Sequence, residues 1–224
     1  MSTLSGGPNI VTNGLIWYLD ASNPKSYISG STTWNDVSKN GNSGALVNGP
    51  SYTSSYGGSV VFDGVNDYFL SPNTILPISS SFTLEYAVLI TELPTTSPAE
   101  YNYIFQNSAG YQTNGIYAEF GPGYYNIITL NSSSIGISIS KVPQANIMYY
   151  MSATYENRTL IVYENGIRYG TTNLTFDPLN NTTNNFYIGN RGPFFVPFWR
   201  FYNRALTPTE VLQNYNAVKG KFGR

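Results

Sequence analysis

The chain of 224 residues contains no cysteine and no histidine. Without cysteine it forms no disulfide and has no thiolate nucleophile. Without histidine it lacks the usual general base and the commonest zinc ligand. Charged residues make up only 10 % and the formal net charge is −1. Nucleic acid and anionic membranes both require a basic surface, so we expect neither as a partner.

Long apolar runs are also missing, and no segment approaches the length of a membrane span. The first residues, MSTLSGGPNIVTNG, have neither the basic region nor the apolar region of a signal peptide. Aromatic residues, in contrast, reach 16 %, with 20 tyrosines. This composition is typical of a β-rich protein exposed outside a cell. We therefore expect a protein that is made in a cytoplasm and exposed after release, as a virion component is.

Short β-like runs alternate with turn clusters along most of the chain. The run 81–90, SFTLEYAVLI, alternates apolar residues with Thr83 and Glu85, which predicts a strand with one buried face. Segment 147–172 contains three β-branched and aromatic runs separated by turns, and its pair Asn165–Gly166 fits a type I′ hairpin. About a dozen strands of this kind are typical of an all-β protein.

One helix is predicted near the C-terminus, in the segment TPTEVLQNYNAVKG. Thr207 is a suitable N-cap, Pro208 occupies the first helical position, and Glu210 completes a capping box. Gly220 is expected to end the helix. The side chains expected to pack against the sheet are Val211, Leu212, Tyr215 and Val218.

These elements predict an all-β fold, a two-sheet antiparallel jelly-roll sandwich with one short C-terminal helix. The sandwich is expected to span residues 14–224. Residues 1–13 are rich in Gly, Ser, Pro and Asn, and they are expected to form a docking arm that the fold does not need.

Three segments carry a family resemblance: the stretch that begins GLIWYLDASNP at Gly14, the hairpin LIVYENGIRYG, and the closing RFYNRALTPTEVLQNYNAVKGKFGR. Together they resemble the laminin G-like, concanavalin A-like jelly-roll family, in the form found in bacteriophage and other viral structural proteins. The resemblance implies a concanavalin A-like fold. That fold is used by lectins, hydrolases, adhesion modules and passive spacers. A calcium ligand of the family, expected just before the closing strand, is replaced here by the apolar GPFFVPFWRF.

Two oxygen-rich segments could bind calcium or could simply be turns. DGVND contains Asp63 and Asp67, and WNDVSKNGNSG contains Asp36, Asn40 and Asn42. Asp and Asn side chains commonly bond the local backbone in turns, whereas calcium requires six or more oxygens. We favour the turns and keep calcium as the alternative. No other cofactor is expected.

Exposed aromatic side chains are candidates for sugar binding, because sugar rings stack on them. The candidates are Tyr101, Tyr103, Tyr111, Tyr124 and Tyr125. Tyr117 belongs to the same cluster of tyrosines in the sequence. For each tyrosine alone, a place in the core is the stronger interpretation. Trp17 and Trp34 are assigned to the core.

The segment FFVPFW lies among Pro and Gly, and Phe194, Phe195 and Phe198 are therefore candidates for an exposed interface. They would contact a second copy of the chain or another virion protein.

Enzyme chemistry has little support in the sequence. No Glu-x-Asp-x-Glu strand of the kind used by glycosidases of this superfamily is present. We predict a non-enzymatic phage virion structural protein, such as a capsid decoration, a head fibre or a fibre-tip module, and host-surface glycan binding is compatible with that role. The alternatives are a carbohydrate-binding lectin or adhesion module and, third, a glycoside hydrolase of the same superfamily.

Overall fold

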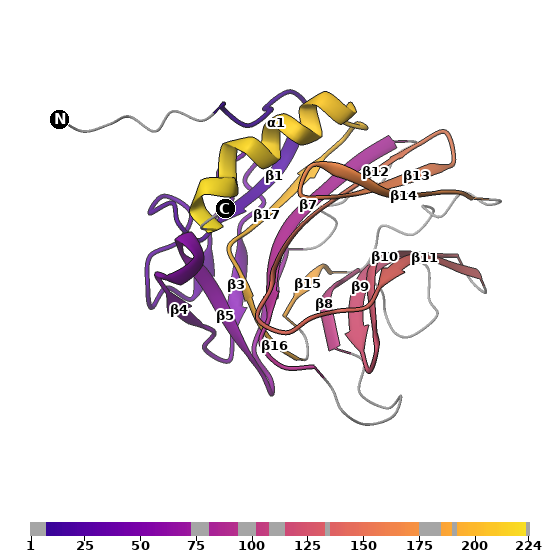
Figure 1. Ribbon diagram of the computed structural model, residues 1–224. Coiled ribbons are helices and arrows are strands. Elements are labelled where there is room, and N and C mark those ends of the chain that lie inside the picture. Colours follow the sequence, from indigo (N-terminus) through magenta and orange to yellow (C-terminus); the bar gives the residue numbers. More distant parts are fainter. Residues whose placement is uncertain are drawn as a thin grey trace.

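A computed structural model describes residues 8–72, 81–93, 102–107, 115–132, 135–174, 185–189 and 192–222. Within these ranges, seventeen strands form two antiparallel sheets, of nine and eight strands. The sheets pack face to face, and one α-helix lies outside the pair (Figure 1). This arrangement confirms the predicted all-β jelly-roll sandwich.

The nine-stranded sheet contains the first and the last strand of the chain. Its main path is β14 (Ile167–Asn173), β13 (Thr159–Glu164), β12 (Met148–Glu156), β7 (Ser81–Ile90), β16 (Gly192–Val196), β5 (Ser59–Gly64) and β4 (Ser51–Thr53). β17 (Phe198–Tyr202) also pairs with β7, and β1 (Leu15–Asp20) pairs with β17. Asn165 and Gly166 have φ values of 53° and 76°, as the predicted type I′ turn between β13 and β14 requires.

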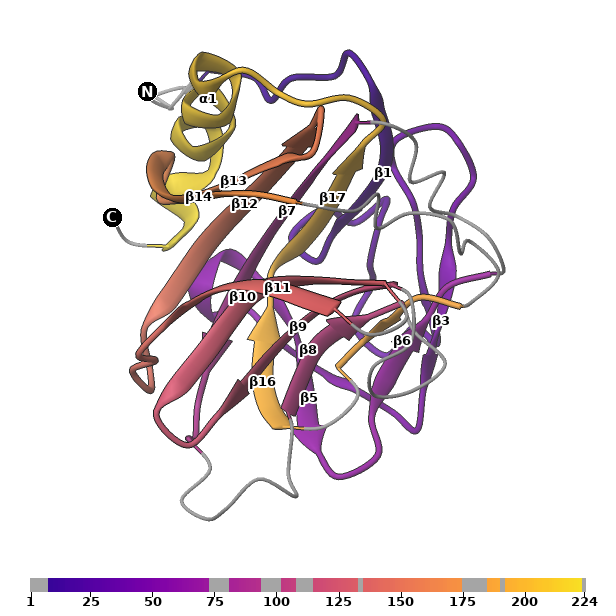
Figure 2. The same ribbon diagram turned by 90° about the vertical axis from the view of Figure 1, so that its right-hand side faces the viewer.

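The eight-stranded sheet forms the second layer (Figure 2). Its order is β11 (Ile135–Lys141), β10 (Tyr124–Ser132), β9 (Gly115–Gly121), β8 (Asn102–Gln106), β15 (Tyr187–Ile188), β6 (Tyr68–Leu70), β3 (Gly44–Val47) and β2 (Thr33–Trp34). Two short 3₁₀ helices complete the described elements, η1 (Ser55–Gly57) and η2 (Lys219–Phe222).

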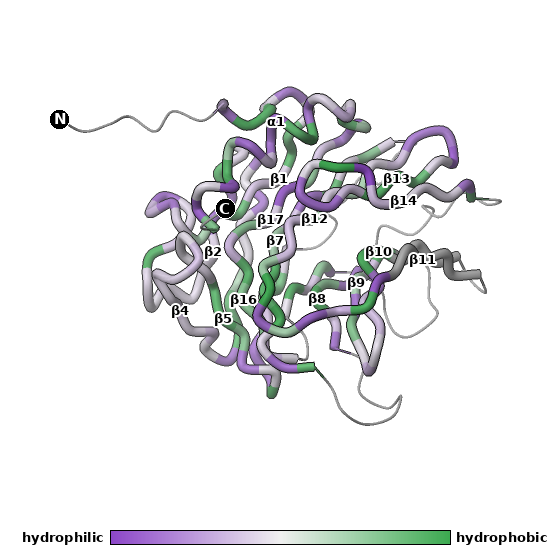
Figure 3. The backbone as a smooth tube through the Cα atoms, viewed as in Figure 1, coloured by the Kyte–Doolittle hydropathy of each residue, from purple (hydrophilic) through white to green (hydrophobic). Residues whose placement is uncertain are grey.

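The core between the sheets is rich in aromatic rings. Hydrophobic residues are frequent along the central strands β7, β16 and β17 (Figure 3). Trp199 lies 4.7 Å from Phe186, 4.8 Å from Phe105 and 5.9 Å from Trp17, measured between ring centroids. Trp17 and Trp34 are fully buried, which confirms their assignment to the core.

Helix α1 (Pro208–Val218) covers the outer face of the nine-stranded sheet (Figures 1 and 2). Its capping box is present: the Glu210 amide donates to Thr207 Oγ1 over 3.3 Å, and the Thr207 amide donates to Glu210 Oε2 over 2.9 Å. The helix does not end at Gly220 but continues into η2, with Lys219 as C-cap. No helix within the described ranges is long and apolar enough to cross a lipid bilayer.

The buried face of α1 differs from the predicted one. Val211, Asn214 and Val218 are buried, whereas Leu212 is 43 % exposed. The prediction that Leu212 packs against the sheet is therefore wrong. Asn214 faces the sheet instead, because its side-chain amide donates to the carboxylate of Glu85 on β7 over 2.9 Å.

Because α1 covers this face, β7 is buried on both sides and not on one side as predicted. Glu85, on the outer side, is fully buried and forms an ion pair with Arg200 over 3.1 Å. Tyr150 and Ser152 donate to its other carboxylate oxygen. Burial raises the pKa of Glu85, and Arg200 opposes that shift.

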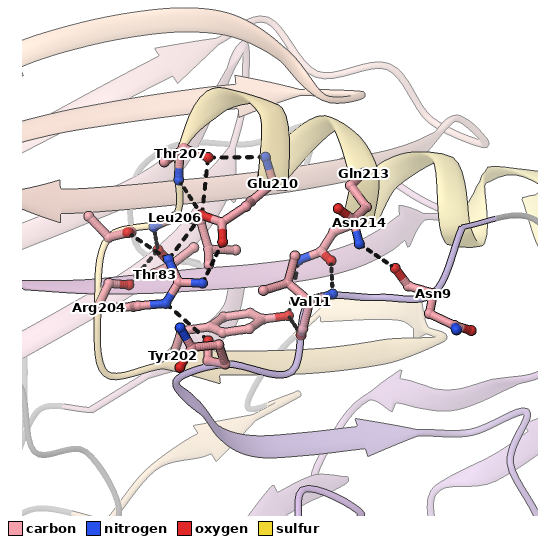
Figure 4. A network of polar contacts seen from close by, with 12 residues as sticks. Asn9, Val11, Thr83, Tyr202, Arg204, Leu206, Thr207, Glu210, Gln213 and Asn214 are labelled. Atoms are coloured by element: carbon pink, nitrogen blue, oxygen red, sulfur yellow. Dashed lines mark hydrogen bonds and ion pairs between the residues drawn. The ribbon is translucent and has the colours of Figure 1, made fainter.

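The segment from Asn9 to Asn13 lies along α1 (Figure 4). The Val11 amide donates to Asn214 Oδ1 over 2.7 Å, and the Tyr202 hydroxyl donates to the Val11 carbonyl over 3.0 Å. These residues are part of the fold, so the predicted boundary of the arm at residue 13 is wrong. Residues 1–7 lie outside the described ranges.

Candidate functional site

A row of side chains crosses the outer face of the eight-stranded sheet. Tyr187 pairs with Leu70 on one side and with Gln106 on the other, and Gln106 pairs with Tyr117. Directly paired residues share a face of the sheet. The residues next to them along the strands, Ile188, Phe105 and Ala118, are fully buried in the core. The row therefore points away from the core.

Five half-buried tyrosines lie on this side of the sheet, and we call them the tyrosine face: Tyr68, Tyr103, Tyr117, Tyr124 and Tyr187. The rings of Tyr68 and Tyr187 are 5.7 Å apart, and those of Tyr103 and Tyr117 are 5.8 Å apart. A β-bulge between Tyr103 and Phe105 lets Tyr103 point outward although it is three residues from Gln106. Partly exposed tyrosine rings provide flat apolar surfaces with a polar edge.

The carboxylate of Glu119 lies among these tyrosines. Glu119 pairs with Tyr103 on β8 and with Asn126 on β10. Its Oε1 accepts a hydrogen bond of 2.9 Å from the side-chain amide of Asn126, and no described atom bonds its Oε2. The residue is only 4 % exposed, and this burial raises the pKa of the carboxyl group. A buried acceptor without a donor is costly, so Oε2 is an unsatisfied polar atom in the middle of the tyrosine face.

A shallow hollow of about 330 Å³ continues this surface toward β2. It is lined by Thr33, Ser43, Gly44, Ala45, Leu70, Ser71 and Pro72. Thr33, Ala45 and Leu70 occupy one register position, the same as Tyr187. The hollow and the tyrosine face therefore form one strip that crosses the strands.

The predicted sugar-binding tyrosines have different outcomes. Tyr103 and Tyr124 lie on the tyrosine face, and the ring of Tyr124 covers Gly121, where an added Cβ would be 2.5 Å from it. Tyr125 does not: it is fully buried, and its hydroxyl lies 2.7 Å from that of Tyr86. Adjacent residues of a strand point to opposite faces of the sheet, so only one of Tyr124 and Tyr125 can lie on the outer face. Tyr101 and Tyr111 lie outside the described ranges.

Two members of the tyrosine face were not among the predicted residues. Tyr68 and Tyr187 come from β6 and β15, far from each other in the sequence. The alternation of Tyr68 with the buried Phe69 is the only local sign that Tyr68 points outward.

The predicted exposed interface at Phe194, Phe195 and Phe198 is wrong for two of the three residues. Phe194 is fully buried against Phe62, 5.7 Å away between ring centroids. Phe198 is 2 % exposed because η2 covers it, with the Phe222 ring 6.2 Å away. Phe195 is half-buried. The neighbouring Pro and Gly residues suggested an exposed patch, but these phenylalanines belong to β16 and β17.

The oxygen-rich segment 36–42 bonds the free edge of β1. Asp36 Oδ1 accepts the amide of Tyr18 over 2.9 Å, and its Oδ2 accepts the amide of Asn42 over 2.9 Å. The side-chain amides of Asn40 and Asn42 donate to the carbonyls of Leu15 and Ile16. These side chains take the place of a neighbouring strand, as a β-sheet edge requires.

Asp63 and Asp67 lie at the turn that leads from β5 of the nine-stranded sheet to β6 of the eight-stranded sheet, as the turn interpretation predicts. Asp63 Oδ1 accepts the amide of Val65 over 2.8 Å, and Gly64 has a φ of 80°. Burial and the nearby Asp63 raise the pKa of Asp67. Within the described part of the chain, no group of three or more His, Cys, Asp or Glu residues could hold a metal ion.

Two antiparallel sheets with a polar and aromatic outer strip define a jelly-roll domain of the lectin-like class. The chain belongs to the concanavalin A-like lectin/glucanases superfamily, whose family model matches residues 63–212, more than half of its length. None of the curated proteins matches this sequence.

Solved structures share the fold at low sequence identity. The binding domain of botulinum neurotoxin serotype D has a TM-score of 0.73 at 12 % identity, covering 92 % of this chain and 52 % of that one. The binding domain of Paraclostridial Mosquitocidal Protein 1 has a TM-score of 0.73 at 15 % identity, with coverages of 92 % and 52 %. Trypanosoma rangeli sialidase has a TM-score of 0.69 at 17 % identity, with coverages of 98 % and 37 %. The chain thus spans about half of the two binding domains and about a third of the sialidase.

Proposed function

We propose that this chain is a non-enzymatic carbohydrate-binding domain and that its glycan lies on the tyrosine face. The observation that carries the proposal is the buried Oε2 of Glu119, which no described donor satisfies, among half-buried tyrosine rings. The solved structures of binding domains that share this fold support the class of function.

The chemistry of the face suits a sugar. Pyranose rings have apolar faces that stack on tyrosine rings, and their hydroxyl groups both donate and accept hydrogen bonds. Glu119 Oε2 would accept from a hydroxyl, and the side-chain amide of Gln106, in the same row, would donate to one. The strip crosses several strands, so an extended glycan of several units would contact more of it than a single sugar.

Binding without hydrolysis is favoured by the surroundings of Glu119. A glycosidase needs a second carboxyl group, about 5–9 Å from the first. Burial alone raises the pKa of Glu119, with the Asn126 hydrogen bond opposing it, and no second described carboxylate contributes. The other buried glutamate, Glu85, is fully used in its ion pair beneath α1.

A glycan array followed by calorimetry tests this proposal. We expect saturable binding to one class of glycan, and Tyr117→Ala and Glu119→Gln should each weaken it at least about tenfold, by loss of stacking or of a charged acceptor. Tyr169→Ala is the matched control, since Tyr169 is exposed on β14 of the other sheet. Silence across a broad array, or equal binding by all three variants, would contradict the proposal.

For the location of this activity we propose the surface of a virion, where the domain would meet host-surface glycans. The resemblance of the sequence to phage structural modules supports this location. Mass spectrometry of purified particles tests it directly. Recovery of the protein only from the soluble fraction of a lysate, away from particles, would contradict it.

A further inference from the structure

A cleft of about 710 Å³ lies on the outer side of the nine-stranded sheet, at the edge formed by β1. Its lining comes from the segment along α1, from β1, and from the two loops that follow β1: Ile10, Thr12, Leu15, Tyr18, Asn23, Lys25, Asp36, Val37, Ser38 and Lys39. Tyr18 points to this side because its neighbours Trp17 and Leu19 are buried in the core. The volume is in the usual range for a small-molecule site.

The cleft is distinct from the tyrosine face. The tyrosine face belongs to the eight-stranded sheet, whereas β1 belongs to the nine-stranded sheet and pairs with β17. A ligand in the cleft would therefore leave the tyrosine face unoccupied, and the inference does not depend on the function proposed above.

Two lysines at the cleft have no acidic partner in the described part of the chain. Four other cations, Lys141, Arg200, Arg204 and Lys221, each form an ion pair. Lys25 and Lys39 form none, and both are exposed. Arg158, Arg168 and Lys219 form no ion pair either, but none of them lines the cleft, so Lys25 and Lys39 are the unpaired cations of this lining.

The one acidic residue of the lining cannot hold these lysines in place. Asp36 Oδ1 accepts the amides of Tyr18 and Ser38, at 2.9 and 2.8 Å. Its Oδ2 accepts the Asn42 amide and the Ser38 hydroxyl, at 2.9 and 2.8 Å. With four donors on two oxygens, this carboxylate is satisfied by its own loop and by β1. The ammonium groups are left for a ligand.

The rest of the lining suits a ring. Leu15, Val37 and Ile10 are apolar, and the Tyr18 ring is fixed because its hydroxyl donates to Asp20 over 2.7 Å. The Arg200 guanidinium lies 5.0 Å from the centroid of that ring. Asn23 adds an amide that can bond hydroxyl groups.

We propose that this cleft binds a small organic anion of the acidic-sugar class, with its carboxylate held by Lys25 and Lys39 and its ring against Leu15 and Tyr18. Carboxylate binding by two ammonium groups supplies charge-assisted hydrogen bonds, and the apolar lining supplies contact with the ring.

The test is a titration followed by ¹H–¹⁵N correlation spectra of the full chain, with D-glucuronate as probe and D-glucose as its neutral counterpart. Glucuronate should shift the amide signals of residues 10–12, 23–25 and 36–39 saturably, and glucose should not. Lys25→Met and Lys39→Met should each raise the Kd about tenfold. Added salt should also weaken binding, because both lysines are exposed.

Lys219→Met is the control, since Lys219 is an exposed lysine on η2, outside the cleft lining. It should bind glucuronate like the unmodified protein, and melting temperatures should show that all three variants fold. Equal binding of glucose, unchanged binding by both cleft variants, or no saturable shift at residues 36–39 would each overturn the proposal. Shifts confined to the tyrosine face would overturn it as well and would leave the glycan proposal intact.

Discussion

Asp36 shows at the scale of one residue how a polar side chain can serve the fold and look like a ligand. Its four hydrogen bonds fix a loop along the free edge of β1, next to the fully buried Trp17. The sequence shows only oxygen atoms at short spacing, and calcium loops have the same pattern. The donors that separate the two cases include Tyr18, 18 residues away, which no local pattern identifies. Glu119 presents the opposite case, since its unpaired oxygen becomes visible only after β9 is placed between β8 and β10.

Replacing Asp36 by alanine should lower the free energy of unfolding by about 2–3 kcal/mol, because several donors lose their acceptor at once. Asp63→Ala, at an exposed turn between the two sheets, should cost less than about 1 kcal/mol. Urea denaturation of both variants measures the difference. Chelation of divalent ions should leave the melting temperature of the unmodified protein unchanged. A fall that calcium reverses would contradict the structural roles of Asp36 and Asp63.

Helix α1 shows what can be predicted at the scale of one element. Its start follows from Thr207, Pro208 and Glu210, since a capping box is a local interaction. Its buried face could not be predicted, because Asn214 replaces the expected Leu212 through a bond to Glu85, 129 residues away. A buried asparagine is favourable only where its partners are in place. The same reason explains why β7 was predicted to be half-buried: the cover on its outer face comes from the far end of the chain.

The two residues of α1 that were expected to be equivalent should differ in mutagenesis. Val211→Ala should cost about 2 kcal/mol, for two buried methyl groups and the space they leave. Leu212→Ala should cost less than about 0.5 kcal/mol, because Leu212 is 43 % exposed and alanine favours helix. Chemical denaturation of both variants measures these costs. Equal losses would place Leu212 in the core and contradict the observed helix orientation.

The ion pair at the start of α1 should make stability depend on acid pH. The Arg204 hydrogen bonds lower the pKa of Glu210 from 4.5 to about 2. A lowered pKa means that the folded state favours the ionised form, so this contribution is fully present above pH 4.5 and is lost as the pH falls toward 2. Arg204→Met should therefore destabilise the protein at pH 6, by about 0.5–1 kcal/mol because the pair is partly exposed, and much less at pH 2. A difference that is independent of pH would contradict this role.

At the scale of the whole molecule, the architecture could be predicted and the placement of surfaces could not. Alternating runs and the hairpin at Asn165–Gly166 are sufficient for an all-β sandwich. The tyrosine face depends on strand order, since the two-residue β15 lies between β6 and β8 and so brings Tyr187 beside Tyr68. The bulge in β8 that turns Tyr103 outward leaves no mark in the sequence. Two of the five residues of the tyrosine face, Tyr68 and Tyr187, could therefore not be predicted before the strand order was known.

Residues 9–13 and helix α1 meet on the outer face of the nine-stranded sheet, and this contact changes what a truncation should do. Backbone atoms of residues 9–13 form four hydrogen bonds with this part of the fold. Two of the partners are on α1, one is Tyr202 of β17, and one is Arg204 between β17 and α1. Deletion of residues 2–13 should remove the hydrogen-bond partners that Val11 provides to Asn214 and Tyr202 beneath α1. It should therefore lower the melting temperature by more than about 5 °C.

Deletion of residues 2–7 is the matched control, because it keeps all four of these contacts and should leave the melting temperature within about 2 °C of the original. Differential scanning calorimetry of the three proteins provides the comparison. If the protein without residues 2–13 has the same melting temperature as the intact protein, residues 9–13 act as a dispensable arm, as their composition alone suggests. If instead only the longer deletion is destabilised, the N-terminal segment fastens α1 over Glu85 and Arg200, and the buried ion pair depends on both ends of the chain.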